Sequence, residues 1–529
     1  MVRGIFALFA CLLVAAPASA ATNCEALAHL TLPGASISSA AFVPAGSSTP
    51  PGGRLVANLP AFCKVTGIIN PAADSNIRFE VWMPGSGWNG KFEGVGNGGF
   101  AGTINYSDMG AALSRGYATA STDTGHQAGV TDAAWAMGHP EKIADFGYRA
   151  IHETAERAKA LIKAFYGQGA RRSYFASCSN GGRQALMEAQ RYPADYDGII
   201  AGAPANFWTH LLASAAFDIK ATLADPASYI PARKLPAIQA AVLSACDALD
   251  GVKDGLLENP PQCHFEPATM LCHGPESDSC LTAAQVEALT KIYTGPRNSK
   301  GEQVFPGYSP GGEAEPGGWA AWITGGAPQQ AAMYFFGTHF FQSMVFADPA
   351  WDFRTFQVDR DTKAADDKMA LILNATDSDL KRFQERGGKL ILYHGWSDAA
   401  IPAQSTIDYY QTVVSKMGAR DTASFVRLFM VPGMQHCGGG SGPNTFGAGA
   451  AEGDAQHDMG RALERWVEDG VAPAQIVATG YKSRSDPASG LARTRPLCPY
   501  PHIARWKGSG STDDAANFVC VKPEAKGSR

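Results

Sequence analysis

Residues 173–182 read Ser-Tyr-Phe-Ala-Ser-Cys-Ser-Asn-Gly-Gly, and this stretch decides the expected fold of the 529-residue chain. An apolar run at Ser173–Ala176 precedes the turn, and a helical pattern over Arg183–Tyr192 follows it. A strand, a tight turn and a helix in this order are typical of a nucleophile elbow, which holds a serine hydroxyl clear of its own backbone. Ser179 is therefore the candidate nucleophile, although Ser177 stands where the Gly-x-Ser-x-Gly pattern has its first glycine.

A general base and an acid come later, in the chain order Ser…Asp…His that α/β-hydrolases share. A serine needs an adjacent base because its free hydroxyl is a weak nucleophile at neutral pH. His436 follows the strand-like run Phe425–Val431 and is the predicted base, and Asp398 lies just beyond the strand-like run Lys389–His394 and is the predicted acid. The plainer alternatives are a polar surface histidine and an aspartate that caps the next helix.

Two cysteines flank these candidates, since Cys178 precedes Ser179 and Cys437 follows His436. If they are bridged, the disulfide would hold their Cα atoms about 5.5–6 Å apart and place Ser179 beside His436. Cys178 could instead be the nucleophile of a thiol hydrolase. The even number of mature cysteines and the partner Cys437 favour the oxidised state.

Two backbone donors are expected to meet the oxyanion of an acyl-transfer intermediate. The amide of Asn180, directly after the nucleophile, is the predicted first donor. The second should come from the glycine-rich loop after the strand-like run Lys91–Val95, where Gly98, Gly99 and Phe100 are the candidates and Gly99 is the predicted donor. Glycines in this loop could equally serve only the turn.

The first twenty residues predict a secretory signal peptide, with Arg3, an apolar run and a small-residue cleavage site at Ala18-Ser19-Ala20. Of eleven cysteines, Cys11 is lost with this leader, which leaves ten. An even number in a secreted chain predicts disulfides, whereas zinc is disfavoured because there is no Cys-x-x-Cys pair. The net charge of -5 and the short apolar runs predict no nucleic-acid partner and no membrane span.

Strand-like and helical segments alternate along most of the chain, which predicts an α/β fold with a mostly parallel sheet and helices on both faces. We expect an α/β-hydrolase core in residues 21–205 and 375–529. The alternation lapses over residues 206–374, which we interpret as an inserted lid domain. The Gly-, Ser- and Pro-rich stretch Pro33–Arg54 is predicted to be a surface loop.

Within the insertion, Asp247, Asp250 and Asp254 place three carboxylates within eight residues, with glycines for sharp turns. Hard oxygen ligands at this density suit a structural Ca²⁺, and the backbone carbonyls of Val252 and Leu256 would complete the cage. The spacing is not that of an EF-hand, and a solvated acidic turn is the alternative.

An aromatic stretch at Trp319–Phe346 provides candidates for lid core and for stacking on an aromatic acyl group. It contains no Lys or Arg. A carboxylate buried without a cation is costly, so an uncharged acyl group is favoured unless Arg297, Arg354 or Arg360 folds over the site. The aromatic residues are Trp319, Trp322, Tyr334, Phe335, Phe336, Phe340, Phe341 and Phe346.

Taken together, these motifs resemble the tannase/feruloyl esterase family, which includes mono(2-hydroxyethyl) terephthalate hydrolases. The resemblance covers nearly the whole mature chain and rests on 178–182, 198–204, 247–256, 394–398 and the pair 436–437. It implies the triad Ser179, Asp398 and His436, and calcium at Asp247, Asp250, Val252, Asp254 and Leu256. It also implies the disulfides Cys178–Cys437, Cys24–Cys63, Cys246–Cys263, Cys272–Cys280 and Cys498–Cys520.

The expected function is that of a secreted serine carboxylic ester hydrolase, which cleaves esters of phenolic acids such as ferulate or gallate through an acyl-enzyme. Its expected partner is a small aromatic ester derived from plant cell wall or tannin. One alternative is hydrolysis of the terephthalate monoester, whose free carboxylate the dedicated hydrolases hold with a lid arginine. Another is a non-catalytic, calcium-stabilised binding protein for aromatic compounds, and a third is a related serine hydrolase of amides or peptides.

Overall fold

A computed structural model describes residues 23–50, 55–447, 454–483 and 486–523 of the chain. The predicted signal peptide at residues 1–20 lies outside these ranges. Among the helices that are described, none is both long and apolar enough to cross a membrane.

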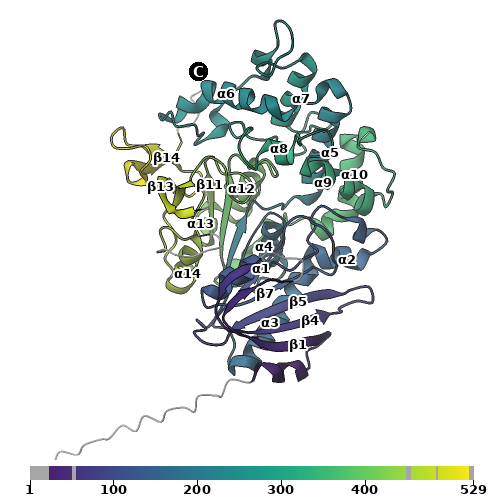
Figure 1. Cartoon of the computed structure of the whole chain (residues 1–529), viewed down its shortest axis with the longest axis vertical. Helices are drawn as coiled ribbons and strands as arrows, with labels where there is room; N and C mark the ends of the chain where they lie inside the picture. The colour runs from purple at the N-terminus through teal and green to yellow at the C-terminus, as the bar shows by residue number, and fades with distance from the viewer. Residues whose placement is uncertain (1–22, 51–54, 448–453, 484–485, 524–529) are drawn as a thin grey trace, which may run out of the picture.

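A nine-stranded sheet runs through the described part of the chain (Figure 1). Its order is β1-β4-β5-β7-β6-β8-β9-β10-β11. The strands from β7 to β11 in this order are parallel, whereas β1, β4 and β5 are joined antiparallel at one edge. The strands are β1 (Ala35–Val43), β4 (Phe62–Ile69), β5 (Ile77–Pro84), β6 (Lys91–Val95), β7 (Ala118–Thr122), β8 (Arg172–Cys178), β9 (Gly198–Gly202), β10 (Lys389–Gly395) and β11 (Val426–Val431).

Helices cover both faces of this sheet. Successive side chains of a strand point to opposite faces, so each strand contributes to two cores. Phe175, Ile199 and Leu390 pack into the core shared with α3, α4 and α12. Their chain neighbours Tyr174 and Ile200 pack on the other face, against α1 and α14. The helices of the core are α1 (Tyr106–Ser114), α2 (Pro140–Ala144), α3 (Ala150–Tyr166), α4 (Asn180–Arg191), α11 (Lys381–Glu385), α12 (Gln404–Met417), α13 (Ala419–Phe425) and α14 (Met459–Asp469).

The prediction of a surface loop at Pro33–Arg54 is wrong. Residues Ala35–Val43 form the edge strand β1, which pairs antiparallel with β4, and β2 (Gly46–Ser48) pairs with β3 (Val56–Leu59). An edge strand has a partner on one side only and half of its surface in water, so a polar sequence is compatible with it.

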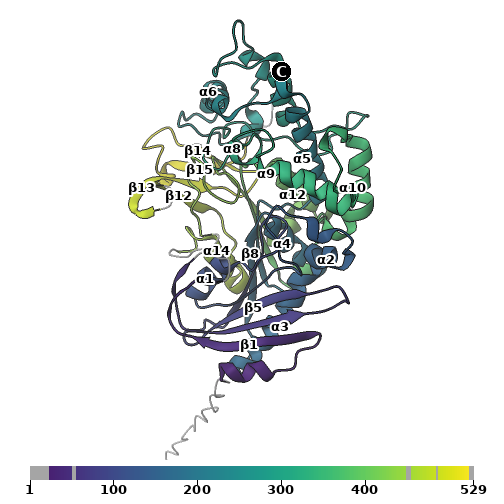
Figure 2. The same cartoon turned by 45° about the vertical axis from the view of Figure 1, so that its right-hand side comes forward.

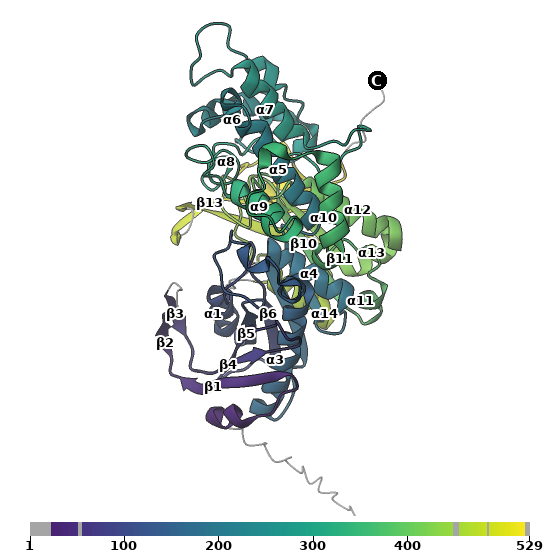
Figure 3. The same cartoon turned by 90° about the vertical axis from the view of Figure 1, so that its right-hand side faces the viewer.

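The insertion at residues 206–374 is built mainly of helices and lies at the end of the molecule opposite β1 (Figures 1 and 3). Its two ends meet, because the Ala375 N–H donates to the Asn206 carbonyl oxygen at 2.8 Å. Its helices are α5 (Trp208–Leu223), α6 (Leu235–Cys246), α7 (Ala283–Thr294), α8 (Trp319–Trp322), α9 (Ala332–His339) and α10 (Val358–Leu373). We refer to residues 206–374 as the lid.

Two small antiparallel pairs close the described chain and lie beside the lid (Figure 2). They are β12 (Ile476–Ser483) with β13 (Asp486–Leu497), and β14 (Ile503–Trp506) with β15 (Phe518–Val521). The sequence analysis did not anticipate these strands.

Candidate active site

Ser179 sits in a strained turn between β8 and α4, with φ 67° and ψ -127°. Its backbone N–H donates to the Gly202 carbonyl oxygen at 2.9 Å, and its carbonyl oxygen accepts from the N–H of Arg183 and Ala205. The turn is tight enough to require glycine at Gly181, where an added Cβ would lie 1.9 Å from the Ser177 Oγ. Ser177 therefore fits at the first position of the elbow only because the residue opposite has no side chain.

The structure brings the three predicted triad side chains together from the segments that follow β8, β10 and β11. His436 Nε2 lies 2.9 Å from Ser179 Oγ, and His436 Nδ1 lies 2.8 Å from Asp398 Oδ2. A carboxylate can only accept, so the Nδ1–H donates to Asp398 and leaves Nε2 free to take the serine proton. This arrangement is the one that a serine nucleophile and its general base require.

Asp398 is buried, and both of its carboxylate oxygens accept hydrogen bonds. Its Oδ1 accepts from the N–H of Ala400 and Ile401, and its Oδ2 accepts from His436 and from His394 Nε2 at 3.1 Å. Burial alone would raise the pKa of this carboxyl, but the charge of His436 and the hydrogen bonds from His394 and His436 outweigh it and hold the pKa below its usual range. Asp398 therefore stays ionised and orients the base.

His394 is a residue of the site whose role the sequence analysis missed, although its motif was noted. Its Nδ1 accepts from the Thr406 hydroxyl at 2.7 Å, which leaves Nε2–H to donate to Asp398 and to the Ile401 carbonyl oxygen at 3.0 Å. His394 thus holds the Asp398 carboxylate in the position where it accepts the hydrogen bond from His436. Its location at the end of β10, four residues before Asp398, was the available signal.

The two predicted oxyanion donors line one cavity together with Ser179 and His436. Asn180 is the first residue of α4, and the first amides of a helix have no partner within it. The Phe100 N–H is already committed to the Val130 carbonyl oxygen at 2.8 Å, which excludes it as the second donor. Gly99, with φ +54°, lines the cavity, and an added Cβ there would lie 2.2 Å from the Val130 oxygen.

Buried polar side chains hold the loop that carries Gly99. The Asn97 N–H donates to Gln184 Oε1 at 3.0 Å, which ties the loop to α4. His126 donates from Nε2 to the Phe100 carbonyl oxygen at 2.8 Å, and burial lowers the pKa of His126 to about 4. The neutral His126 imidazole stacks on Trp135 and thus holds the Phe100 end of the loop in place.

Five disulfides connect the ten cysteines of the described chain, in the pairs that the family resemblance implied. Cys178 and Cys437 are bridged with their Cα atoms 5.9 Å apart. The bond therefore joins the chain neighbours of Ser179 and His436. With Cys178 oxidised, a thiol nucleophile at this position is excluded.

The cavity in front of Ser179 is mainly apolar, and six of its nine apolar lining residues belong to the lid. Trp322 stands edge-on to His436, with ring centroids 4.9 Å apart. None of the described residues that line this cavity is Asp, Glu, Lys or Arg. The apolar lining residues are Ala205, Trp208, Leu211, Leu212, Trp322, Met333, Phe336, Ala400 and Ile401.

The three arginines that could have supplied a cation do not line the cavity. Arg297 donates to the Gly301 carbonyl oxygen at 2.9 Å, and Arg354 pairs with Asp352 at 2.9 Å. Arg360 pairs with Asp361 at 2.6 Å. Each is therefore bound locally, away from Ser179.

The predicted calcium loop is the part of the lid that contacts the C-terminal strands. Asp247 accepts from the N–H of Gly255 at 3.0 Å, and Asp250 accepts from the N–H of Val252 at 2.9 Å. Burial, with the nearby charge of Asp254, raises the pKa of Asp250 to about 6. Neither Asp247 nor Asp250 has an ion-pair partner within 4.0 Å among the described residues, so the oxygen donors fit a hard cation.

One carboxylate of this loop is already paired, because Asp254 contacts Arg495 and lies 3.5 Å from Arg493 of β13. Val252 packs in a small apolar cluster with Ala504 and Phe518. The loop therefore fastens the lid to the C-terminal strands.

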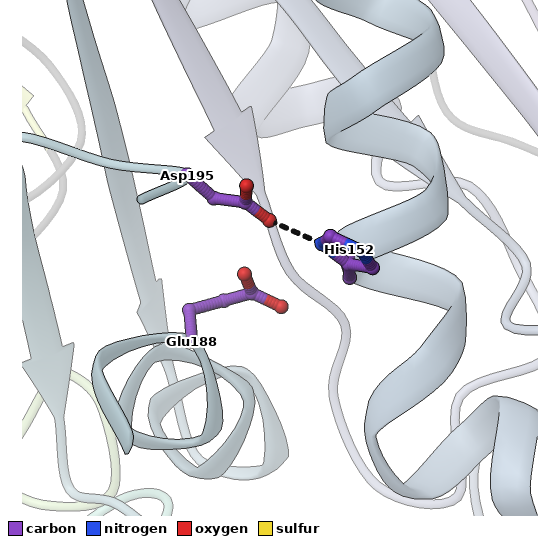
Figure 4. A group of neighbouring side chains, drawn as sticks. All are labelled: His152, Glu188 and Asp195. Carbon is purple, nitrogen blue, oxygen red and sulfur yellow. Dashed lines mark hydrogen bonds and ion pairs between the residues drawn. The ribbon is translucent and has the colours of Figure 1, made fainter. Parts of the chain in front are cut away.

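A second group of potential ligands consists of His152 of α3, Glu188 near the C-terminal end of α4, and Asp195, whose side chains lie close together (Figure 4). His152 Nδ1 is 2.6 Å from Asp195 Oδ2, a hydrogen-bond distance that is shorter than the separation of about 3.3 Å between two ligands of one tetrahedral zinc. The ammonium of Lys159 is 3.7 Å from Asp195 Oδ1. Burial and the charge of Asp195 raise the pKa of Glu188 well above its ordinary value, which favours its neutral form. The group is thus an ion-pair network.

Comparisons with known proteins show the family of this chain. The profile of the family described as "Tannase and feruloyl esterase" matches residues 63–521. An uncharacterized esterase of Xanthomonas campestris pv. campestris is 46% identical, over 95% of this chain and 92% of its own length. The mono(2-hydroxyethyl) terephthalate hydrolase of Piscinibacter sakaiensis is 35% identical, over 88% of this chain and 86% of its own.

The crystal structure of feruloyl esterase B from Aspergillus oryzae superposes with a TM-score of 0.87 at 32% identity, over 94% of this chain and 99% of that one. The sheet, the elbow and the covering helices define an α/β-hydrolase fold. The chain belongs to the tannase and feruloyl esterase family, which is a family of esterases.

Proposed function

We propose that this protein is a secreted serine esterase that hydrolyses esters of uncharged aromatic acids, with phenolic acids such as ferulic acid as the acyl group. The observation that carries the proposal is the hydrogen-bonded series Ser179, His436 and Asp398 beside a mainly apolar cavity that, in the part of the chain the structure describes, has no lining Lys or Arg. An aromatic ring is stabilised in such a cavity, whereas a free carboxylate would lie there without a cation.

In the proposed reaction, Ser179 Oγ attacks the ester carbonyl carbon while its proton passes to His436 Nε2. The carbonyl electron pair moves to the oxygen, which the amides of Asn180 and Gly99 stabilise. The C–O bond to the alcohol then breaks, and the alkoxide leaves with the proton from His436. Water attacks the acyl-enzyme by the same sequence and releases the aromatic acid and free Ser179.

The first experiment measures initial rates with methyl ferulate for the wild type and for Ser179→Ala. Turnover that is lost in the variant, together with fluorophosphonate labelling of the wild type alone, is the expected result. A folded, fully oxidised wild type without turnover and without labelling would contradict the proposal and favour a binding protein.

The acyl preference is tested with two substrates that share a ring and differ in charge, namely bis- and mono(2-hydroxyethyl) terephthalate. Without a lining cation, we expect kcat/KM for the neutral diester to exceed that for the anionic monoester at least about ten-fold, because an unpaired carboxylate is costly to bury. Equal or better turnover of the monoester would refute the charge argument while leaving the serine mechanism intact.

We further propose one structural Ca²⁺ at Asp247, Asp250 and Asp254 with the carbonyls of Val252 and Leu256. The support is a pair of partly buried carboxylates without an ion-pair partner in a loop that joins the lid to the core. Dialysed protein should contain one equivalent of calcium, and a chelator should lower the melting temperature, because an ion that binds only the folded state stabilises it. Protein without calcium, or a melting temperature unchanged by chelator, would overturn this assignment.

Secretion belongs to the same proposal and is supported by the five disulfides, which form in oxidising compartments. The intact mass of the exported protein should correspond to a chain that begins at Ala21. An unprocessed chain retained in the cytoplasm would contradict it.

A further inference from the structure

Arg183, in the first turn of α4, is a fully buried cation with no acid beside it. Its side chain is 0% exposed. Among the described residues, no carboxylate lies within 4.0 Å of its guanidinium. The group lies instead over two aromatic rings, those of Phe146 at 4.7 Å and Trp208 at 5.1 Å.

All the acceptors of this guanidinium are neutral. Nε donates to the Asn180 side-chain oxygen at 2.9 Å. The two terminal nitrogens donate to the backbone carbonyl oxygens of Gly147 at 2.7 Å, Phe146 at 3.0 Å and Leu373 at 3.3 Å. The carbonyls of Phe146 and Gly147 belong to a π-helical turn between α2 and α3, and Leu373 ends the lid helix α10.

Burying a charge without a counter-charge is costly. Burial lowers the pKa of Arg183 to about 9, so the side chain remains a cation at neutral pH. A neutral donor could satisfy some of the same carbonyls without that cost. An unpaired buried cation next to a reactive serine therefore indicates that a negative charge develops nearby during the reaction.

Asn180 connects the cation to that negative charge, because its backbone amide is the proposed first oxyanion donor and its side chain is held by Arg183. We propose that Arg183 is a positioning residue for the oxyanion hole. It fixes Asn180 and supplies, from behind, a positive charge that stabilises the tetrahedral oxyanion in a site of low dielectric constant. Through Trp208 and Leu373 the same side chain also supports the acyl cavity and the end of the lid. This inference rests on the proposed esterase function.

The test compares Arg183→Gln and Arg183→Lys with the wild type on methyl ferulate. Arg183→Gln should lower kcat about 10- to 100-fold and change KM less than about three-fold, because the lost interaction belongs to the transition state. Arg183→Lys keeps the charge but loses the fork of donors, so it should recover part of kcat.

The second readout separates positioning from folding. An arylboronic acid forms a tetrahedral anion on the serine, whereas the amide of the same aromatic acid binds as an uncharged ground-state analogue. In Arg183→Gln, the inhibition constant for the boronate should rise at least ten-fold more than that for the amide. Equal shifts of the two constants would show that Arg183 acts only through packing and would overturn the inference.

Arg149→Gln is the matched control, because Arg149 lies in the π-helical turn that Arg183 contacts but is paired with Asp145 at 2.5 Å and Glu141 at 2.8 Å. This variant should lose thermal stability while the ratio of boronate to amide constants stays at the wild-type value. If the wild type neither turns over esters nor binds the boronate, the esterase proposal itself fails. A wild type that does both, with an unaltered Arg183→Gln variant, refutes only the role of Arg183.

Discussion

Removal of the Cys178–Cys437 disulfide should damage catalysis more than the loss of stability explains. The bond joins residues 259 positions apart in the sequence, and its two cysteines are the chain neighbours of Ser179 and His436. The chain-entropy model assigns a cross-link of this length about 5–6 kcal/mol of stability. In the double variant Cys178→Ala/Cys437→Ala, we expect kcat to fall about 10- to 100-fold, since a misplacement of 1 Å can cost about 100-fold in rate.

The matched control is Cys272→Ala/Cys280→Ala, which opens a bridge between residues only 8 positions apart in the lid. The same model gives this short loop about 2.5 kcal/mol. The assay measures kcat and KM for methyl ferulate under conditions where circular dichroism shows both variants folded, and urea unfolding records the loss of stability. The control should lose stability and keep kcat. A Cys178–Cys437 variant that unfolds at lower urea concentration but keeps the wild-type kcat would refute the positioning role of this bond.

Two further substitutions test the site and the electrostatics of the core. Gly99→Ala should lower kcat about 100- to 1,000-fold with little change in KM. The added Cβ would lie 2.2 Å from the Val130 carbonyl oxygen, so the backbone that carries this oxyanion donor would have to move. An unchanged kcat would exclude Gly99 as that donor. Burial raises the pKa of Glu93 to about 7, against the attraction of Arg115, so the unfolded chain releases this proton at lower pH than the folded one. The contribution of Glu93 to stability should therefore fall as pH rises from about 4.5 to 7, and Glu93→Gln should be more stable than the wild type by about 3 kcal/mol at pH 8 and equal to it at pH 4. Urea titrations at the two pH values measure the difference, and an equal difference at both would contradict it.

The sequence predicted the parts of the fold that follow from short-range patterns. The strand-like runs Lys91–Val95, Ser173–Ala176, Lys389–His394 and Phe425–Val431 correspond to β6, β8, β10 and β11, and the family resemblance is confirmed by the profile match. The edge strand β1 was not predicted, because its solvent-facing side is rich in Ser and Ala. The strands β12 to β15 were not predicted either. Their positions depend on distant contacts: Ile476 and Leu497 of the first pair pack in a core cluster with β10 and β11, and Phe518 of the second pair packs with Val252 of the lid.

Within the site, chain order was enough to select Ser179, Asp398 and His436, whose side chains the structure brings within hydrogen-bond distance. The sequence could not show which of Gly98, Gly99 and Phe100 supplies the second oxyanion donor. The choice depends on which amide the fold already uses, and only the structure shows that Phe100 donates to Val130. The role of Arg183 could not be predicted from the sequence either, because arginine is common in the first turn of a helix. Only the structure shows that its hydrogen-bond acceptors are neutral and that its side chain is buried.

The loop that carries His436 is held by the lid as well as by the core, which constrains how the site can open. Gln435 donates to the Gly312 carbonyl oxygen at 2.8 Å, and the Ser441 N–H donates to Glu315 at 2.7 Å. On the same loop, Gly433 lies against the side chain of Leu256, where an added Cβ would come within 2.5 Å.

These contacts make the 311–318 segment of the lid and the calcium loop part of the support of His436. A motion that lifted this side of the lid would break the positioning of the base. We therefore expect the 311–318 segment to keep its place while substrate enters the cavity. By the same reasoning, a change in the loop of Asp247 and Asp250 has a short path to the triad through Leu256. Removal of the Ca²⁺ that we propose at this loop should therefore lower kcat as well as the melting temperature.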